Sequence, residues 1–316
     1  MPDNDSHKIP IPKVMTVAEF FQRFGDQDAC HEHLKTVRWG HDLERFACPD
    51  CGHTRGWWLP RRQLVECADC HRQTSVTAGT IMHGVRTPLW KWLWAIYQLA
   101  HDKKGIAAME LSKQVRVCYE TAWTMLHKIR AAMGQRDQRY TLQGLVEVDE
   151  CYVGGKETGR IGRGAETKSP VAVAVELNVD GKPRHVAMRA IERADAVSLR
   201  KFAECKIEKG ATLKTDGWGA YRSVAKAGYE HVATVTGGGS KAAETFPWLH
   251  TFIGNMKRMI LGTYHSVSRK HLNHYLAEFD YRANRRWGEQ GLFDRLVIAA
   301  VSAKPLTFKQ LTTGAT

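Results

Sequence analysis

Hydrophobic periodicity changes along this chain of 316 residues, from helical spacing before Tyr140 to β-rich runs after it. In the first part, apolar residues recur every three to four positions, which is the spacing of helices with one buried face. The pattern predicts helices over 16–37 with a break at Gly25, and over 88–102, 106–114 and 119–133. We therefore expect an N-terminal helical region followed by an α/β region.

The second part opens with a run of β-branched residues and continues with strands and helices. Asp180-Gly181 is a strong hairpin signal between two of the strands, and Asp195 is a candidate helix N-cap. The expected elements are strands over 145–153, 170–178, 184–191 and 211–215, a helix from Asp195 to about residue 208, and a last helix near 291–303. Three meandering strands, a helix and a fourth strand form the order of an RNase H-like fold, in which the fourth strand lies parallel to the first and beside it.

The opening strand carries three carboxylates inside an otherwise apolar run. Alternate side chains of a strand face opposite sides, so Glu147 and Asp149 share one face and Glu150 points to the other. A carboxylate in a buried strand is costly unless it is paired or holds a metal ion; an edge strand with one solvated face is the simpler alternative. Asp216 ends the fourth strand and would converge with Asp149 in the fold above. Glu147 is a further candidate, either as a spare ligand or as a group that supports one.

Cysteine spacing indicates a structural metal site. The pairs Cys48-Pro-Asp-Cys51 and Cys67-Ala-Asp-Cys70 are separated by fifteen residues, and two C-x-x-C turns at such a separation are typical of zinc sites. Four thiolates complete a tetrahedral shell without an open position, as structural zinc sites require. The segment between the pairs reads as two strands, so we expect a zinc ribbon; a metal-free redox pair or accidental spacing is the alternative.

Two stretches have the character of DNA-binding surfaces. The predicted helices over 106–114 and 119–133 are joined by a tight turn, as in a helix-turn-helix, with Lys128 and Arg130 on the second helix. An ordinary helical hairpin explains the same pattern. Between residues 255 and 286, seven Lys or Arg residues stand against two acids and are interleaved with aromatic residues. This segment indicates a second DNA-facing surface, with a solvated basic face as the alternative.

Charge and composition narrow the class of partner. Lys and Arg number 46 against 33 Asp and Glu, a formal charge of +13, which favours polyanionic partners and most simply nucleic acid. No apolar run approaches the ~18–20 residues that cross a bilayer, and the N-terminus has no apolar signal core. We therefore expect a cytoplasmic, nucleoid-associated protein without membrane contact, in which paired cysteines bind metal rather than form disulfides.

Collinear blocks along the chain resemble the insertion-sequence 1595 (ISXO-like) family of transposases over roughly residues 16–300. Besides the paired cysteines, the blocks are Thr77-Ala-Gly-Thr80, Val146-Glu-Val-Asp-Glu150, Thr215-Asp-Gly-Trp218, Asn255-Met-Lys-Arg258, Gly262-Thr-Tyr-His265 and Glu278-Phe-Asp-Tyr-Arg282. The resemblance implies a DDE-type transposase whose catalytic residues are Asp149, Asp216, Asn255 and Lys257. The third position is Asn where many related transposases carry an acid.

The same resemblance implies a DNA transposase that binds the terminal inverted repeats of its insertion sequence as a homodimer and cleaves and transfers DNA strands into a target. Two Mg²⁺ or Mn²⁺ ions would be held by Asp149, Asp216 and the amide oxygen of Asn255, and Lys257 would hold a phosphate. The implied contacts with double-stranded DNA are Lys104, Lys128, Arg130, Arg258, Arg269, Lys270, Arg282, Arg285 and Arg286. A catalytically inactive or domesticated DNA-binding protein is the alternative, and a host RNase H-like nuclease is a third class.

These expectations describe a mixed α/β chain in five parts. They are a disordered lead and helical cap (1–44), a zinc ribbon (45–78), a helix-turn-helix region (88–134), an RNase H-like catalytic domain (143–303) and a tail (304–316). The catalytic domain is expected to contain a mixed five-stranded sheet flanked by helices.

Overall fold

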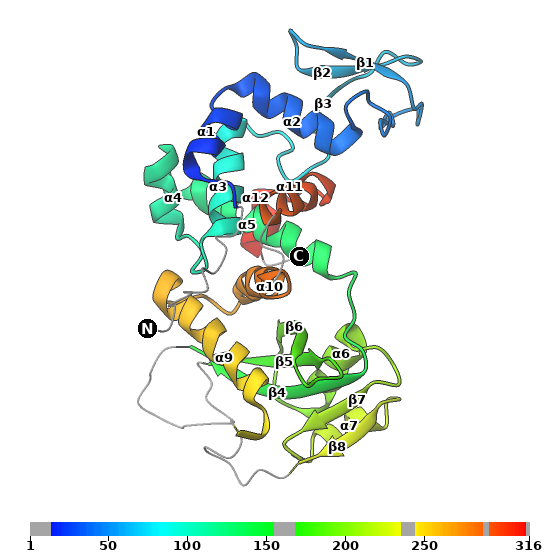
Figure 1. Ribbon diagram of the computed structural model, residues 1–316, viewed down its shortest axis with the longest axis vertical. Coiled ribbons are helices and arrows are strands. Elements are labelled where there is room, and N and C mark those ends of the chain that lie inside the picture. Colours follow the sequence, from blue (N-terminus) through cyan, green and yellow to red (C-terminus); the bar gives the residue numbers. More distant parts are fainter. Residues whose placement is uncertain (1–13, 155–167, 235–243, 287–290, 314–316) are drawn as a thin grey trace, which may run out of the picture.

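The computed structural model describes residues 14–154, 168–234, 244–286 and 291–313 of the chain. Figure 1 shows three parts that follow one another along the long axis: a small three-stranded sheet, a group of helices, and a five-stranded sheet with its own helices. Most of the expected N-terminal lead, residues 1–13, lies outside the described residues.

Two helices and a small antiparallel sheet open the chain. Helices α1 (Val17–Phe24) and α2 (Gln27–Trp39) are separated at Gly25, as predicted, and Asp26 caps the second helix by accepting from Asp28 N. The strands of the ribbon are β1 (Gly56–Leu59), β2 (Leu64–Cys67) and β3 (Gln73–Ser75). The hairpin of β1 and β2 was predicted, whereas β3, only three residues long, was not.

Helix α5 (Tyr119–Asp137) is the centre of the helical part. Around it lie α3 (Leu89–His101), α4 (Ala108–Val115), α11 (Leu292–Ser302) and α12 (Phe308–Thr313). The buried side chains of α11 belong to the same core as those of α2, α3 and α5. This corrects the predicted domain boundary at residue 303, because the last long helix packs with the N-terminal helices and not with the sheet. The expected tail also contains a helix, α12, whose Leu311 is buried.

A mixed five-stranded sheet forms the α/β part, as predicted. Its strands in spatial order are β6 (Pro183–Ala190), β5 (Ser169–Leu177), β4 (Leu145–Val153), β7 (Thr212–Thr215) and β8 (Glu230–Ala233). The first three are antiparallel neighbours, whereas β7 runs parallel to β4 and β8 runs parallel to β7. Strand β4 is therefore central and has the fourth strand beside it, which is the order of an RNase H-like fold.

Helices cover both faces of this sheet. On one face, α6 (Ala196–Lys206) and α7 (Tyr221–Ala225) pack against Val146 and Val148 of β4. On the other face lie α9 (Pro247–Met259), the π-helical turn η1 (Ile260–Tyr264) and α10 (Leu272–Ala283), which pack against Cys151 and Val153. None of the described helices is long and apolar enough to span a bilayer.

Candidate active site and DNA-binding surfaces

Strand β4 presents its acidic side chains to two different helical layers. Because alternate residues face opposite sides, Glu147 and Asp149 share the face of Cys151, which packs with α9. Glu150 shares the face of Val148, which packs with α6 and α7. The predicted division of the three acids between the two faces is confirmed.

Asp149 and Asp216 come together at the boundary of two parallel strands. The paired register of β4 and β7 ends at Glu147 and Lys214. Continued by two residues along each chain, this register leads to Asp149 beside Asp216, which directly follows β7. Neighbouring strands lie about 4.7–4.9 Å apart, so two carboxylates in this continued register would be within reach of one metal ion. Burial raises the pKa of the nearby Tyr221, and acids that include Asp149 and Asp216 raise it further.

Local backbone geometry orients both aspartates. Asp149 Oδ1 accepts a hydrogen bond from the amide of Glu150 at 2.8 Å, and Asp216 Oδ1 accepts from the amide of Trp218 at 2.9 Å. The second contact is a turn in which the side chain of an aspartate bonds the backbone two residues later. Gly217, inside this turn, has a φ of +83°, a conformation that favours glycine. The Asp-Gly-Trp motif therefore fixes the direction of the Asp216 carboxylate.

Glu147 and Glu150 are each committed to another partner. Glu150 Oε2 accepts a hydrogen bond from the hydroxyl of Tyr221 at 3.0 Å, on the face away from α9. Glu147 is 2% exposed, and its Oε1 lies 3.6 Å from Lys214 Nζ across the β4–β7 pair. Burial raises the pKa of Glu147, and the charge of Lys214 opposes this rise. We therefore assign Glu147 to a cross-strand ion pair and treat Asp149 and Asp216 as the candidate catalytic acids.

Helix α9 separates the two other predicted catalytic residues. Its buried stripe consists of Leu249, Phe252, Ile253, Met256 and Met259. Asn255 and Lys257 flank this stripe on opposite sides, because two residues turn a helix by about 200°. Asn255 Oδ1 accepts from Arg258 Nη2 at 2.6 Å, and Asn255 lines a cavity against α10. Lys257 lies toward β4, where burial raises the pKa of Cys151 and the Lys257 charge opposes the rise. Asn255, the expected metal ligand, and Lys257, the expected phosphate contact, therefore lie on different flanks of α9.

A basic cavity of about 660 Å³ lies between α9, α10 and the turn that joins α3 to α4. The cationic residues that line it are Lys103, Lys104, Arg258, Arg282 and Arg286, together with apolar residues such as Phe252 and Phe279. The turn is docked by its backbone: Thr263 Oγ1 donates to Lys104 O at 2.8 Å, and Arg282 donates to Lys103 O. Four of the expected DNA contacts thus gather at one cavity. Lys103 also lines the cavity but was not among the expected contacts, whereas its neighbour Lys104 was.

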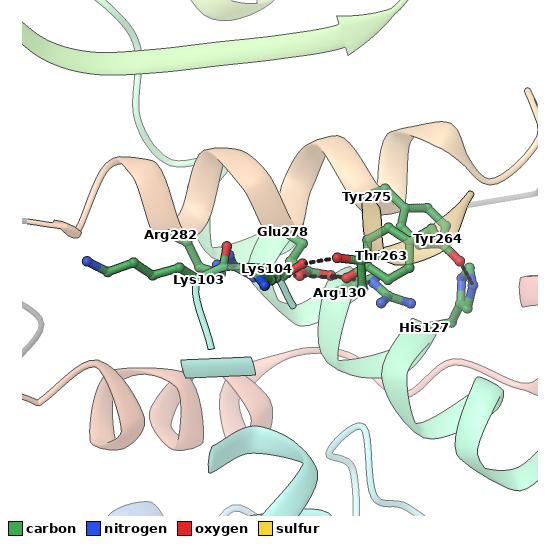
Figure 2. A network of polar contacts seen from close by, with 9 residues as sticks. All are labelled: Lys103, Lys104, His127, Arg130, Thr263, Tyr264, Tyr275, Glu278 and Arg282. Carbon is green, nitrogen blue, oxygen red and sulfur yellow. Dashed lines mark hydrogen bonds and ion pairs between the residues drawn. The ribbon is translucent and has the colours of Figure 1, made fainter. Parts of the chain in front are cut away.

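Two other expected DNA contacts are buried, and a third is mostly covered. Arg130 is 2% exposed, and its Nε donates to Glu278 Oε2 at 2.7 Å (Figure 2). Arg285 donates from both terminal nitrogens to Asp137, at 2.6 and 3.1 Å. Lys128 is 8% exposed within α5. These side chains stabilise the helical packing and are largely withdrawn from solvent, which corrects the expectation that they face DNA.

Helices α4 and α5 have the connectivity of a helix-turn-helix, but little of the second helix is accessible. A turn of three residues joins them, with Arg116 in the left-handed region at φ +49°. Every residue of α5 from Met125 to Met133 is buried. The accessible surface lies at the start of the helix, where Tyr119 is 49% exposed. A DNA contact through this unit would therefore involve the first turn of α5.

Four thiols meet between the turns of the ribbon. The Sγ atoms of Cys48 and Cys70 are 3.5 Å apart, those of Cys51 and Cys67 are 3.6 Å apart, and all four lie within 4.8 Å of one another. Zinc–sulfur bonds of about 2.3 Å in a tetrahedron imply sulfur separations of about 3.8 Å. The donor set therefore fits a structural zinc ion, which explains how so short a ribbon folds.

Three histidines form a second cluster between α5 and α10. Ring nitrogens of His127, His271 and His274 lie within 4.8 Å of one another. Burial lowers the pKa of His127 to about 2 and that of His274 to about 4, and the charge of Arg130 lowers both further. The same charge opposes a metal dication, and Trp123 stacks on His127 with ring centroids 3.9 Å apart. We assign this cluster to packing.

Comparisons with known proteins agree with this architecture. A family described as the ISXO2-like transposase domain matches residues 141–284, and one described as a transposase zinc-ribbon domain matches residues 25–73. No curated protein matches the chain. Among solved structures, the Mos1 strand transfer complex is 12% identical over 68% of this chain and 78% of that chain, with a TM-score of 0.30. The Mos1 mariner paired end complex with Mn is 13% identical over 66% and 77%, with a TM-score of 0.26. TM-scores this low support no conclusion.

Proposed function

Because the chain belongs to the ISXO2-like transposases of the IS1595 family, we propose that this DNA transposase cuts and joins strands where Asp149 and Asp216 meet. The observation that supports the proposal is the parallel pairing of β4 with β7 at the centre of the sheet, because both strands lead directly to the two aspartates. Carboxylates are the ligands that Mg²⁺ prefers and that Mn²⁺ also accepts. Ions held there would activate the attacking oxygen and stabilise the leaving oxygen of an in-line displacement.

Lys257 is proposed to hold a phosphate beside the acid pair. It lies on the flank of α9 toward β4, where its charge acts on Cys151, two residues beyond Asp149. An ammonium group serves there as a point charge for a phosphate oxygen. Since Lys257 supplies no metal ligand, its replacement by Ala should slow cleavage while the protein still binds divalent metal.

The basic cavity is proposed to hold the DNA strand that leads to this site. Its lysines lie at the exposed turn after α3, and Arg258 projects from α9 itself. Arg269 and Lys270, at the exposed approach to α10, extend the basic surface. Phosphate contacts of this kind release counterions, so binding should weaken steeply as salt rises. Arg282 is already ion-paired, because Glu278 accepts from its Nη1 at 2.8 Å.

Recognition of the terminal inverted repeats is proposed to use the zinc ribbon and the first turn of α5. The ribbon lies at the opposite end of the molecule from the five-stranded sheet (Figure 1), so recognition and chemistry occupy different surfaces. A homodimer would place one ribbon and one acid pair at each end of the element.

Strand cleavage of a labelled terminal-repeat duplex tests the function. With Mg²⁺ or Mn²⁺, the wild type should cut at the repeat end. Asp149→Ala and Asp216→Ala should bind the duplex with unchanged affinity but cut it about a thousandfold more slowly, because several kcal/mol of transition-state stabilisation are lost. Wild-type rates in both variants would refute the site. A wild type that binds the repeat and never cuts it would instead support the inactive DNA-binding protein.

A further inference from the structure

We infer that Glu147 and Lys214 are positioning residues of the proposed reaction, which hold the first turn of α9 in place beside the candidate active site. The inference rests on the proposed function, because it concerns how Lys257 on α9 is set against the acid pair. Glu147 lies two residues before Asp149 on β4. Lys214 lies two residues before Asp216, which directly follows β7. The two charges therefore stand on the strands that lead to the aspartates.

Strand pairing alone does not account for this ion pair. Glu147 is 2% exposed, and its Oε1 lies 3.6 Å from Lys214 Nζ across the paired register of β4 and β7. Removing two charges from water is costly, and well-packed apolar residues of similar volume often hold such a position equally well. The neighbouring cross-strand pair, Val146 and Leu213, is apolar and buried. The charges therefore indicate a role beyond the sheet, and both act at the start of α9.

Lys214 holds the two residues that precede α9. Its Nζ donates to Thr245 O at 3.3 Å and lies 4.9 Å from the ring centroid of Phe246. Phe246 is the N-cap residue of α9, and its apolar side chain, which is buried, cannot cap the helix. Because one half-buried ammonium group makes both contacts, β7 fixes the position at which α9 begins.

Glu147 supplies the negative charge that the first turn of α9 lacks. That turn contains no acidic residue, and Pro247 stands at its start. The amides of a first turn have no partner within the helix and carry partial positive charge, which a carboxylate stabilises. Burial raises the pKa of Glu147, and both Lys214 and the amide of Leu249 in this turn oppose the rise. The carboxylate on β4 therefore faces the start of the helix as well as Lys214.

A shift at the first turn of α9 would be amplified at Lys257. This residue lies roughly 15 Å along the helix from Pro247, at 1.5 Å per residue. A tilt of about 4° at the start of the helix would therefore displace the Lys257 backbone by about 1 Å. Misplacement of a group by about 1 Å can slow a reaction by about a hundredfold. Glu147 and Lys214 thus act on the reaction through Lys257, and neither needs to touch DNA or metal.

Single-turnover cleavage of the labelled terminal-repeat duplex, with Mn²⁺ and with the full-length protein in excess, tests the inference. The double variant Glu147→Met, Lys214→Met replaces the ion pair by apolar side chains, so it leaves no charge buried and should melt at about the wild-type temperature. It should bind the duplex and Mn²⁺ as the wild type does but cut about tenfold or more slowly. Lys214→Arg, which keeps the charge and the donor, should cut at nearly the wild-type rate. The matched control Glu176→Met, Arg184→Met removes an ion pair from β5 and β6 and should leave the rate unchanged.

A double-mutant cycle with Lys257→Ala shows whether the pair acts through α9. The double methionine variant should slow the Lys257→Ala protein by less than about twofold, because the effects of residues that act through one another do not add. Equal slowing in both backgrounds would overturn the inference, and so would a wild-type rate in the double methionine variant. In either case, slow cleavage by Asp149→Ala shows that the proposed function stands. If Asp149→Ala itself cuts at the wild-type rate, the proposed function fails and the inference fails with it.

Discussion

Arg130 and Glu278, 148 residues apart in the sequence, form an ion pair that is buried on both sides: Nε donates to Oε2 at 2.7 Å, and the side chains are 2% and 0% exposed. Tyr264 and Arg282 also donate to Glu278, at 2.9 and 2.8 Å. Figure 2 shows this network between α5, α10 and the turn at Lys103. It joins the N-terminal helices to the α/β part, so it fixes the basic cavity relative to the sheet.

Replacement of one partner should destabilise the protein strongly. Arg130→Met leaves the Glu278 carboxylate buried without its main cation, which costs about 3–5 kcal/mol. Urea denaturation, followed by far-ultraviolet circular dichroism, measures the free energy of unfolding. The matched control is Arg200→Ala, which breaks an exposed pair with Glu204 and should cost less than about 1 kcal/mol. Equal costs for the two variants would contradict the structural role of the buried pair.

Gly105 fixes the turn that carries the two cavity lysines. Its φ is +76°, and a Cβ there would lie 2.2 Å from the hydroxyl of Tyr264 and 2.4 Å from Glu278 Oε1. Gly105→Ala should therefore cost more than the roughly 1–2 kcal/mol of left-handed strain alone. Gly181→Ala, at φ +72° with open space around it, should show only that strain. A thermal melt that ranks the two variants equally would refute the close packing of this turn.

Two histidines with lowered pKa values should make stability depend on pH. His33 and His274 each have a pKa lowered to about 4, chiefly by burial, so between pH 6.5 and 4 the unfolded chain binds protons that the folded chain does not. The free energy of unfolding is therefore highest above pH 6.5. It falls by about 1.4 kcal/mol per histidine for each pH unit as the pH drops from 6.5 towards 4. Urea melts from pH 7 to 5 should show this slope, and His274→Gln should reduce it. Replacement of the exposed His41 by Gln should leave the slope unchanged, and an unaltered slope in His274→Gln would oppose this explanation.

Zinc should be necessary for the ribbon and should be bound once per chain. Strong chelators, or Cys67→Ser at a fully buried thiol, should unfold residues 45–72 and expose them to trypsin, because the short strands have little core of their own. Cys205→Ser, at an exposed thiol outside the cluster, should keep the metal. Elemental analysis that finds no tightly held zinc in the wild type would contradict the assignment.

Local patterns in the sequence were sufficient to predict the strands around the candidate site. Alternation along β4 separates Asp149 from Glu150, and the strand–helix–strand order predicts Asp216 at the end of a neighbouring parallel strand. Both inferences depend on short-range periodicity and on the few ways in which such strands can pair. The same patterns located the helices α1 to α5 and the zinc ligands.

Long-range packing could not be predicted in the same way. The charge of Arg130 on a helix suggested a DNA contact, because its partner Glu278 is distant in the sequence. The return of α11 to the N-terminal core likewise has no local signature, since its apolar stripe fits either core. For Asn255 and Lys257 the local pattern was informative. Residues two apart point in different directions on a helix, but the family motif suggested that these two act together.

Asp149 and Glu150 are adjacent residues on opposite faces of β4, so their isosteric amides test directly whether the chemistry occurs on the α9 face. On a labelled terminal-repeat duplex with Mn²⁺, Asp149→Asn should cleave about a thousandfold more slowly than the wild type, because it loses a charged metal ligand. Glu150→Gln, which can still accept the hydrogen bond from Tyr221, should cleave at nearly the wild-type rate. A wild-type rate in Asp149→Asn, or a loss of cleavage in Glu150→Gln alone, would contradict the proposed active site.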